Sequence, residues 1–333
     1  MNAARGRVSA WAELLRVSAL ATVPGEAPGR AARGRVTAWA ELLRVSALAT
    51  VPGDALAGAA AAGLRPNRST VLAIGTSVCL YEAGMALNDW ADRAEDAVDR
   101  PHRPLPSGRV TPPAALAASA ALTAVGLTLA ARAGRPALAT ATALAATVWS
   151  YDLYLKHTPA ASATMATARA LNLLLGSVTT STAPSSPGPR RARPPAAAWQ
   201  AAATVGAHTY AVTSVSRHET QGGSTRTPLL ALATTLTLAA VTARRPPPGA
   251  TAAGTFVTAA LAASYARTPA APFLHAALNP SPPLTQRSVG AGIRALIPLQ
   301  AGLAARSGAP GTALLVLGLA PLARALARKV SPT

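Results

Sequence analysis

Residues 69–99 read STVLAIGTSVCLYEAGMALNDWADRAEDAVD, a long apolar run that ends in a cluster of acidic residues. Its first part, residues 69–90, is largely apolar and about as long as an α-helix that crosses a bilayer. Residues 89–99, at its end, hold five of the twelve carboxylates of the chain. Similar apolar stretches recur along the whole sequence, which predicts an all-α, polytopic transmembrane helical bundle of nine or ten helices.

The composition agrees with a membrane protein. Of the 333 residues, 50% are hydrophobic and only 13% are charged. The net charge of +19 does not indicate nucleic-acid binding, because the basic residues are scattered through short connections without interleaved aromatic residues. Cys79 is the only cysteine, which excludes a disulfide framework and a thiolate metal site.

The predicted spans are bounded by clusters of Pro, Gly or Arg. They lie near residues 38–63, 69–90, 113–131, 136–155, 160–180, 196–215, 227–243, 250–267, 287–304 and 311–327. Residues 181–195, rich in Pro, Ser and Arg, are the longest polar break and are predicted to form a flexible loop. Arginines occur in both sets of loops, so charge does not decide the orientation in the membrane.

The N-terminus contains a near-exact repeat. Residues 4–25 return as residues 32–53, with Thr37 in place of Ser9. A solenoid needs at least three units, so two terminal copies indicate a duplication or a start-site artefact. We therefore expect residues 1–35 to be a disordered or artefactual extension and residues 36–330 to form a single membrane domain.

The carboxylates after the first quoted span are predicted to share a helix face. At helical spacing, one amide and four carboxylates project from the same side. They are Asn88, Asp89, Asp92, Asp96 and Asp99. Oxygen ligands favour a hard cation, and Mg²⁺ commonly joins one or two carboxylates to a substrate phosphate. The alternative is a solvated, salt-bridged loop, since arginines follow directly in residues 100–109.

Two blocks of sequence carry a resemblance to a known family. The first is Asn88-Asp-Trp-Ala-Asp-Arg-Ala-Glu-Asp96 followed by Asp99-Arg-Pro-His-Arg-Pro-Leu-Pro-Ser-Gly108. The second is Tyr151-Asp-Leu-Tyr-Leu-Lys156 followed by Asn172-Leu-Leu-Leu-Gly176. Together they resemble the UbiA-type (4-hydroxybenzoate polyprenyltransferase-like) membrane prenyltransferases. Residues 216–223 and 280–290 resemble most closely the EboC-like branch.

The resemblance implies a helical bundle with a central cavity, a Mg²⁺-bound prenyl diphosphate, and transfer of the prenyl group to an acceptor that is often aromatic. It implies metal ligation by Asn88, Asp92, Asp96 and Glu219. It implies contacts to the bound diphosphate from Asn88, Asp89, Asp92, Asp96, Asn172, Arg217 and Glu219. Catalytic roles fall to Lys156, Tyr151 and Arg103.

Simpler roles remain open for several of these residues. Tyr151 could be an interfacial anchor and Lys156 a snorkelling side chain, while Asn172 could hydrogen-bond another helix. The family's second Asp-rich element is reduced here to Glu219, the only acidic residue after Asp152. Either one Mg²⁺ suffices, with positive charge from the neighbouring arginine and histidine, or diphosphate ionisation is lost.

Three functions are therefore weighed for a multi-pass protein of a bacterial cell membrane. The first is a prenyltransferase that binds membrane lipid, a prenyl diphosphate and a lipophilic or aromatic acceptor, but no nucleic acid. The second is a non-catalytic isoprenoid-binding or transport-associated protein. The third, a secondary transporter, predicts carboxylates near the bilayer midplane rather than at a helix end.

Overall fold

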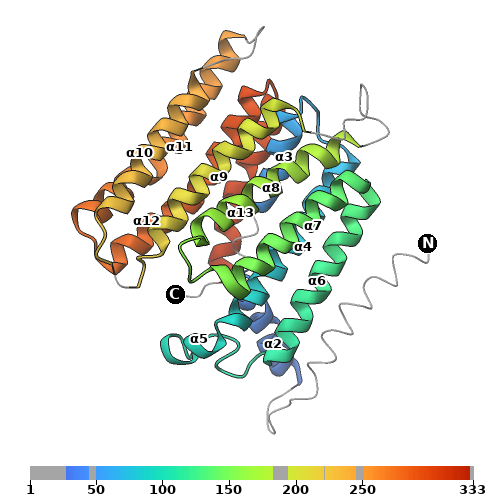
Figure 1. The fold of residues 1–333 in the computed structure, drawn as a ribbon, viewed down its shortest axis with the longest axis vertical. Helices are drawn as coiled ribbons and strands as arrows, with labels where there is room; N and C mark the ends of the chain where they lie inside the picture. Colours follow the sequence, from blue (N-terminus) through green and yellow to red (C-terminus); the bar gives the residue numbers. More distant parts are fainter. Residues whose placement is uncertain (1–27, 45–49, 183–193, 221, 245–250, 331–333) are drawn as a thin grey trace.

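The structure, a computed structural model, describes residues 28–44, 50–182, 194–220, 222–244 and 251–330. Within these residues the chain forms helices and no strands (Figure 1). The elements are α2 (Pro28–Leu42), α3 (Val51–Ala61), α4 (Arg68–Ala91), α5 (Arg93–Asp99), α6 (Pro112–Ala133), α7 (Arg135–Ser150), the π-helical turn η3 (Tyr151–Leu155), α8 (Ala161–Ser181), α9 (Ala196–Ser216), α10 (Arg226–Ala243), α11 (Ala252–Leu278), α12 (Pro282–Arg306) and α13 (Pro310–Val330).

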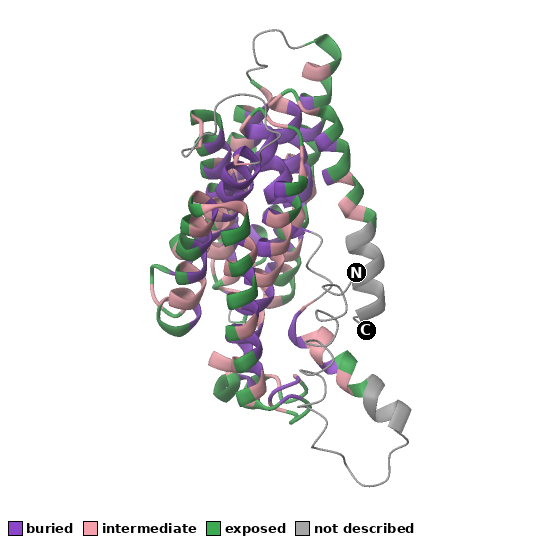
Figure 2. Cartoon of the chain, turned by 90° about the vertical axis from the view of Figure 1, so that its right-hand side faces the viewer, coloured by how far each residue is buried: buried purple, intermediate pink, exposed green. Residues whose placement is uncertain are grey.

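The bundle is that of a multi-pass membrane protein. Four described helices, α4, α6, α10 and α12, are long and apolar enough to cross a membrane. Large apolar side chains lie on the outside, among them Phe256 at 74% exposure and Leu230 at 66%. Figure 2 shows buried residues along the middle of the bundle and exposed ones on its outer helix faces. Such an outside suits lipid, because apolar side chains are stable there.

Most predicted spans coincide with helices, and the differences have physical reasons. The expected single span 38–63 is wrong, since α2 ends at Leu42 and α3 begins at Val51. Arg44, just after α2, adopts a left-handed backbone with φ 47°, which cannot continue a helix. Helix α11 runs beyond residue 267 because prolines inside membrane helices are tolerated, here Pro269 and Pro272. Residues 183–193 and 1–27, predicted as a loop and an extension, lie outside the described residues.

Helix α4 has a well-defined start. The Asn67 side chain accepts hydrogen bonds from the backbone N–H groups of Ser69 (2.9 Å) and Thr70 (3.2 Å), and the Thr70 hydroxyl accepts one from the Asn67 N–H group (2.9 Å). This capping box satisfies N–H groups that the first helical turn leaves without partners. It fixes the register of the helix that carries the acidic cluster at its other end.

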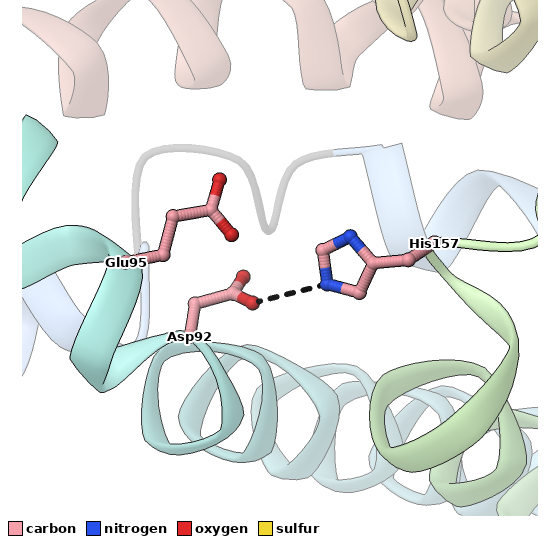
Figure 3. A group of neighbouring side chains, drawn as sticks. All are labelled: Asp92, Glu95 and His157. Atoms are coloured by element: carbon pink, nitrogen blue, oxygen red, sulfur yellow. Dashed lines mark ion pairs between the residues drawn. The ribbon is translucent and has the colours of Figure 1, made fainter.

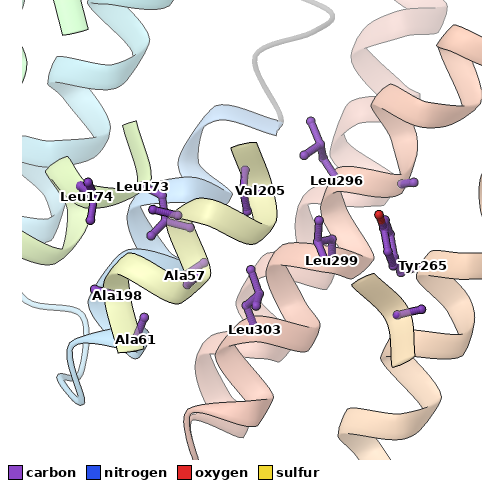
Figure 4. Packing of buried hydrophobic residues seen from close by; sticks show 14 residues of the cluster. Ala57, Ala61, Leu173, Leu174, Ala198, Val205, Tyr265, Leu296, Leu299 and Leu303 are labelled. Carbon is purple, nitrogen blue, oxygen red and sulfur yellow. The ribbon is translucent and has the colours of Figure 1, made fainter. Parts of the chain in front are cut away.

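Short α3 packs very closely against α8. A Cβ atom on Gly58 would lie 2.1 Å from the Leu173 carbonyl oxygen, and one on Gly176 would lie 2.5 Å from the Ala55 Cα atom. Small residues allow such close approach of membrane helices. Leu173 also belongs to the main apolar cluster, to which α3, α8, α9, α10, α11 and α12 contribute (Figure 4).

A buried polar network joins the same helices. Asp54 on α3 is fully buried, and its carboxylate accepts hydrogen bonds from Arg169 (2.9 Å) and Asn172 (2.8 Å) on α8 and from Gln300 (2.6 Å) on α12. The Asn172 side-chain oxygen accepts a further bond of 2.6 Å from Ser77 on α4. Charged groups at this depth are costly unless paired, so the network fixes α3 relative to its neighbours.

Four connections gather at one end of the bundle, which we call the polar end. They are residues 92–111, 156–160, 217–225 apart from residue 221, and 279–281, and side-chain and backbone contacts join them. The Arg217 guanidinium donates to the Thr158 carbonyl (2.7 Å), and the Gly223 N–H group donates to the Pro280 carbonyl (2.9 Å). Gly222 has φ 65°, and a Cβ atom there would lie 2.3 Å from the same Pro280 oxygen, so this contact requires glycine. The polar end carries most of the predicted site residues.

Candidate active site

The acidic segment bends at Asp92. Helix α4 ends at Ala91 and α5 begins at Arg93, with Asp92 between them at φ −86° and ψ 3°. The predicted single acidic face is therefore wrong, because it assumed one straight helix. Asp99 is exposed at the far end of α5, while Asp89 and Asp96 are buried. The bend divides the remaining carboxylates into two groups.

The first group is Asp89 and Asp96, and arginines neutralise it. The Arg103 guanidinium donates to Asp96 (2.7 Å) and lies 3.6 Å from Asp89. Arg44 donates to Asp89 (3.1 Å), and Arg100 donates to Asp96 (3.3 Å). The two aspartates are only 4% and 2% exposed. The alternative prediction, a solvated loop held by salt bridges, agrees with these ion pairs. It is wrong about the solvation, because both aspartates are buried.

The second group surrounds Asp92. Lys156 forms an ion pair with the Asp92 carboxylate, and the His157 Nε2 atom lies 3.9 Å from the same oxygen. Ligand atoms of Asp92, Glu95 and His157 all lie within 4.8 Å of one another (Figure 3). Among the described residues this is the one group of three such side chains that could hold a metal ion. Two of its three side chains are carboxylates, which are ligands that suit a hard divalent cation.

A pocket of about 230 Å³ lies beside Asp92, between the end of α4 and η3. It is lined by Trp90, Ala91, Arg93, Asp152, Leu153, Tyr154, Lys156 and His157. The Asn88 amide donates to the Asp152 carboxylate (3.2 Å), so Asn88 holds a neighbouring side chain of the pocket. A π-helical turn such as η3 often marks a functional site, since the extra residue redirects side chains. Tyr151, half-buried, opens this turn.

Asn172 does not lie in this site. Its amide belongs to the Asp54 network, where it contacts Ser77 as well as Asp54. Ser77 and Asn88 are eleven residues apart on α4, or about 16 Å at 1.5 Å rise per residue. The predicted contact of Asn172 with a diphosphate is therefore replaced by the simpler alternative, a hydrogen bond between helices.

The turn after α9 holds the remaining predicted residues. Arg217 is tied to the segment after Lys156 by its bond to Thr158. Glu219 is half-buried, and burial raises the pKa of its carboxyl above the ordinary value, while the Arg100 guanidinium opposes this rise. Glu219 thus lies near Arg100 in the arginine-rich loop of residues 100–111, which we call the arginine loop, and is not part of the metal-ligating group around Asp92. Among the described residues, Glu219 therefore does not form a second group of metal-ligating side chains.

Sequence reasoning missed four contributors to the site: Arg44, Glu95, Asp152 and His157. Glu95 and His157 adjoin predicted residues, and the bend at Asp92 and the π-helical turn bring them together. Asp152 lies inside the Tyr151–Lys156 block, where its acidity in an apolar stretch was a usable signal. Arg44 had no signal, because only the tertiary position of α2 places it against Asp89.

Comparisons with known proteins identify the family. The profile of the UbiA prenyltransferase family matches residues 47–227. The digeranylgeranylglyceryl phosphate synthase of Methanopyrus kandleri is 38% identical over 104 residues, which are 31% of this chain and 38% of the relative. That of Methanothrix thermoacetophila is 37% identical over 114 residues, 32% of this chain and 43% of the relative. The aligned part thus spans about two fifths of these curated relatives.

Solved structures show the same fold. A UbiA homolog from Archaeoglobus fulgidus bound to GPP and Mg²⁺ aligns with a TM-score of 0.57 at 17% identity, covering 82% of this chain and 99% of the other. The apo structure of a UbiA homolog from Aeropyrum pernix K1 gives 0.55 at 20% identity, with 77% and 96% covered.

Proposed function

Because this chain belongs to the UbiA prenyltransferase family, we propose that it transfers an isoprenoid group from a prenyl diphosphate to an acceptor at the polar end of the bundle. The observation that carries the proposal is the Asp92 group, where two carboxylates and the Lys156 ammonium meet beside a pocket at a membrane-helix end. Ion-binding carboxylates and a fixed cation are what an anionic diphosphate requires.

The residues present fit a magnesium ion. Asp92 and Glu95 supply hard oxygen ligands, while the His157 imidazole suits Mg²⁺ less well. Both carboxylate oxygens of the predicted ligand Asp96 are engaged by arginines. The predicted ligand Asn88 donates to Asp152 through its amide NH2 group, so this bond leaves its side-chain oxygen available to a cation. A bound ion would stabilise the negative charge that develops on the leaving diphosphate oxygens. The Mg²⁺-bound solved homologs support this assignment.

Residues of the chain would hold the diphosphate and exclude water. Lys156 is only 9% exposed, and its ammonium would pair with diphosphate oxygens as a point charge. Arg103, already between two aspartates, would contact the diphosphate through its unused N–H groups. The Tyr151 hydroxyl would donate a hydrogen bond to the diphosphate. The apolar bundle around these groups would keep water from an allylic cation.

The acceptor and the host membrane are finer proposals. An aromatic acceptor is our expectation from the family as a whole. The sequence relatives are named digeranylgeranylglyceryl phosphate synthases, which supports a glyceryl phosphate as an alternative acceptor. A bacterial membrane is likewise proposed, although these relatives come from archaea.

The test is diphosphate release by purified protein in detergent, with Mg²⁺, labelled prenyl diphosphates of several lengths, and both aromatic and glyceryl phosphate acceptors. We expect Mg²⁺-dependent release and a loss of at least about a hundredfold in Asp92→Asn. The matched control is Asp99→Asn, an exposed carboxylate of the same segment, which should keep its rate. No release with any substrate pair, or equal loss in both variants, would refute the proposal.

One observation favours a second candidate, a non-catalytic isoprenoid binder. Asp89 and Asp96 are neutralised by arginines, and Glu219 is the only acidic residue after Asp152. A protein without a complete metal site could retain binding and lose turnover. The same preparation decides between the two, because the binder predicts Mg²⁺-dependent binding of prenyl diphosphate, abolished in Asp92→Asn, without diphosphate release.

A further inference from the structure

Helix α2 is docked on the acidic end of α4 by apolar contacts. Ala38 and Leu42 are fully buried and Leu43 is 9% exposed. Together they form one apolar cluster with residues of α4, the arginine loop and α6. The partners are Ala83, Ala86, Leu105, Val110, Ala115 and Leu122. These residues define what we call the α2 docking site.

Two ion pairs fix the docked helix in one register. Arg109 lies 2.8 Å from Glu41, and Arg44 lies 3.1 Å from Asp89. Glu41 lies in the last turn of α2 and Arg44 follows the helix directly, and the two ion pairs hold both side chains against the polar end. The docking site therefore recognises a short amphipathic segment with an acidic residue, two leucines and an arginine in that order.

The chain contains this segment twice. Residues 10–16 read AWAELLR, and residues 38–44 read AWAELLR. The second copy makes these contacts through Glu41, Leu42 and Arg44. The first copy has the same three residue types at the same spacing. The substitution between the copies in this part, Ser9 for Thr37, falls at an exposed position of α2.

We infer that the α2 docking site accepts either copy, so residues 4–16 exchange in the same chain with residues 32–44. The contacts are equal, and the tethers to α3 decide the occupancy. From Arg44 to Val51 the tether is residues 45–50, whereas from Arg16 it is residues 17–50. The loop-closure penalty grows as the three-halves power of tether length, which favours the second copy by about 13-fold. Because Arg16 would then face Asp89, the exchange leaves the charge balance of the site unchanged.

The experiment crosslinks each copy to Arg109, in the full chain with Cys79→Ala so that no other thiol remains. One variant combines Glu41→Cys with Arg109→Cys, and its matched partner combines Glu13→Cys with Arg109→Cys. A short bismaleimide should crosslink both, and when the reaction is quenched early the second should give about a thirteenth of the yield of the first, because early yield follows occupancy. Adding Leu42→Ala and Leu43→Ala should raise the Glu13→Cys yield severalfold, whereas Leu14→Ala and Leu15→Ala should abolish it.

Two results would overturn the inference. One is the absence of a Glu13→Cys crosslink in the Leu42→Ala, Leu43→Ala background while the Glu41→Cys pair still reacts in its own background. The other is a Glu13→Cys product that runs only as a dimer, which would place the first copy on a neighbouring chain. Alanine is used in place of a charged residue so that the bundle stays folded, and a melting temperature for each variant checks this.

Discussion

Replacing Asp54 by asparagine should destabilise the bundle by about 3–5 kcal/mol, since it removes one partner of a buried ion pair. The Arg169 side chain is 16% exposed and Asp54 is fully buried, so water compensates little of the lost charge. The isosteric amide keeps the volume of the carboxylate. The effect is therefore electrostatic and not a cavity.

The contacts of Asp54 show whether lost hydrogen bonds or the lost ion pair contributes more to this destabilisation. Its oxygens accept three hydrogen bonds, from Arg169, Asn172 and Gln300. Hydrogen bonds between membrane helices contribute about 0.6 kcal/mol each, so weakening two neutral ones accounts for about 1 kcal/mol. The remainder comes from the unpaired guanidinium. A double variant, Asp54→Asn with Arg169→Met, should accordingly recover most of the loss.

The measurement is unfolding in mixed detergent micelles, followed by tryptophan fluorescence. Glu41→Gln is the matched control, because Glu41 pairs with Arg109 at a similar distance, 2.8 Å against 2.9 Å for Asp54 and Arg169. The control pair is 31% and 39% exposed, so its loss should cost at most about 1 kcal/mol. If both single variants cost the same, or if the double variant is as unstable as Asp54→Asn, the reasoning is refuted.

Three further changes have expected outcomes. Lys156→Met should lower diphosphate release about a hundredfold. It should also tighten Mg²⁺ binding, measured by calorimetry, because the Lys156 ammonium pairs with the Asp92 carboxylate. An unchanged Mg²⁺ affinity would contradict this. Gly176→Ala should cost about 1–3 kcal/mol in micelle unfolding through overpacking, whereas Gly318→Ala, with open space around it, should cost nothing. The raised pKa of Glu219 means that the folded protein favours the neutral carboxyl. The free energy of unfolding should therefore fall as the pH rises above 4.5, the ordinary pKa of a glutamate. Melting curves of Glu219→Gln should lack this fall.

Sequence patterns predicted most of the fold, since apolar length and helix-ending residues are local properties. Nine described helices of 16 residues or more match predicted spans, in agreement with the expected nine or ten. The failures occurred where tertiary contacts override local signals. Pro269 and Pro272 follow the predicted span 250–267 as helix-ending residues, but they lie inside α11. The left-handed Arg44, which follows α2, has no sequence signature at all.

The candidate site was predicted in position and not in geometry. Spacing correctly put Asp89, Asp92 and Asp96 at one helix end. It could not show the bend at Asp92, because an acidic run is compatible with a straight helix. Asn172 was assigned to the wrong place for a similar reason, since its partner Asp54 is distant in sequence and only packing brings the two together.

The bend changes the chemistry of the acidic segment, because it separates charge of opposite sign. Asp89 and Asp96 carry two negative charges and are contacted by Arg44, Arg100 and Arg103, so this half has an excess of one positive charge. Asp92 and Glu95 also carry two, and the paired cation there is Lys156, so that half has an excess of one negative charge. Under the proposed function, a divalent cation would be attracted to the second half and diphosphate oxygens to the first. The motif would then supply both parts of a cation–diphosphate site without a second acidic element, and the reduction to Glu219 would be compatible with turnover.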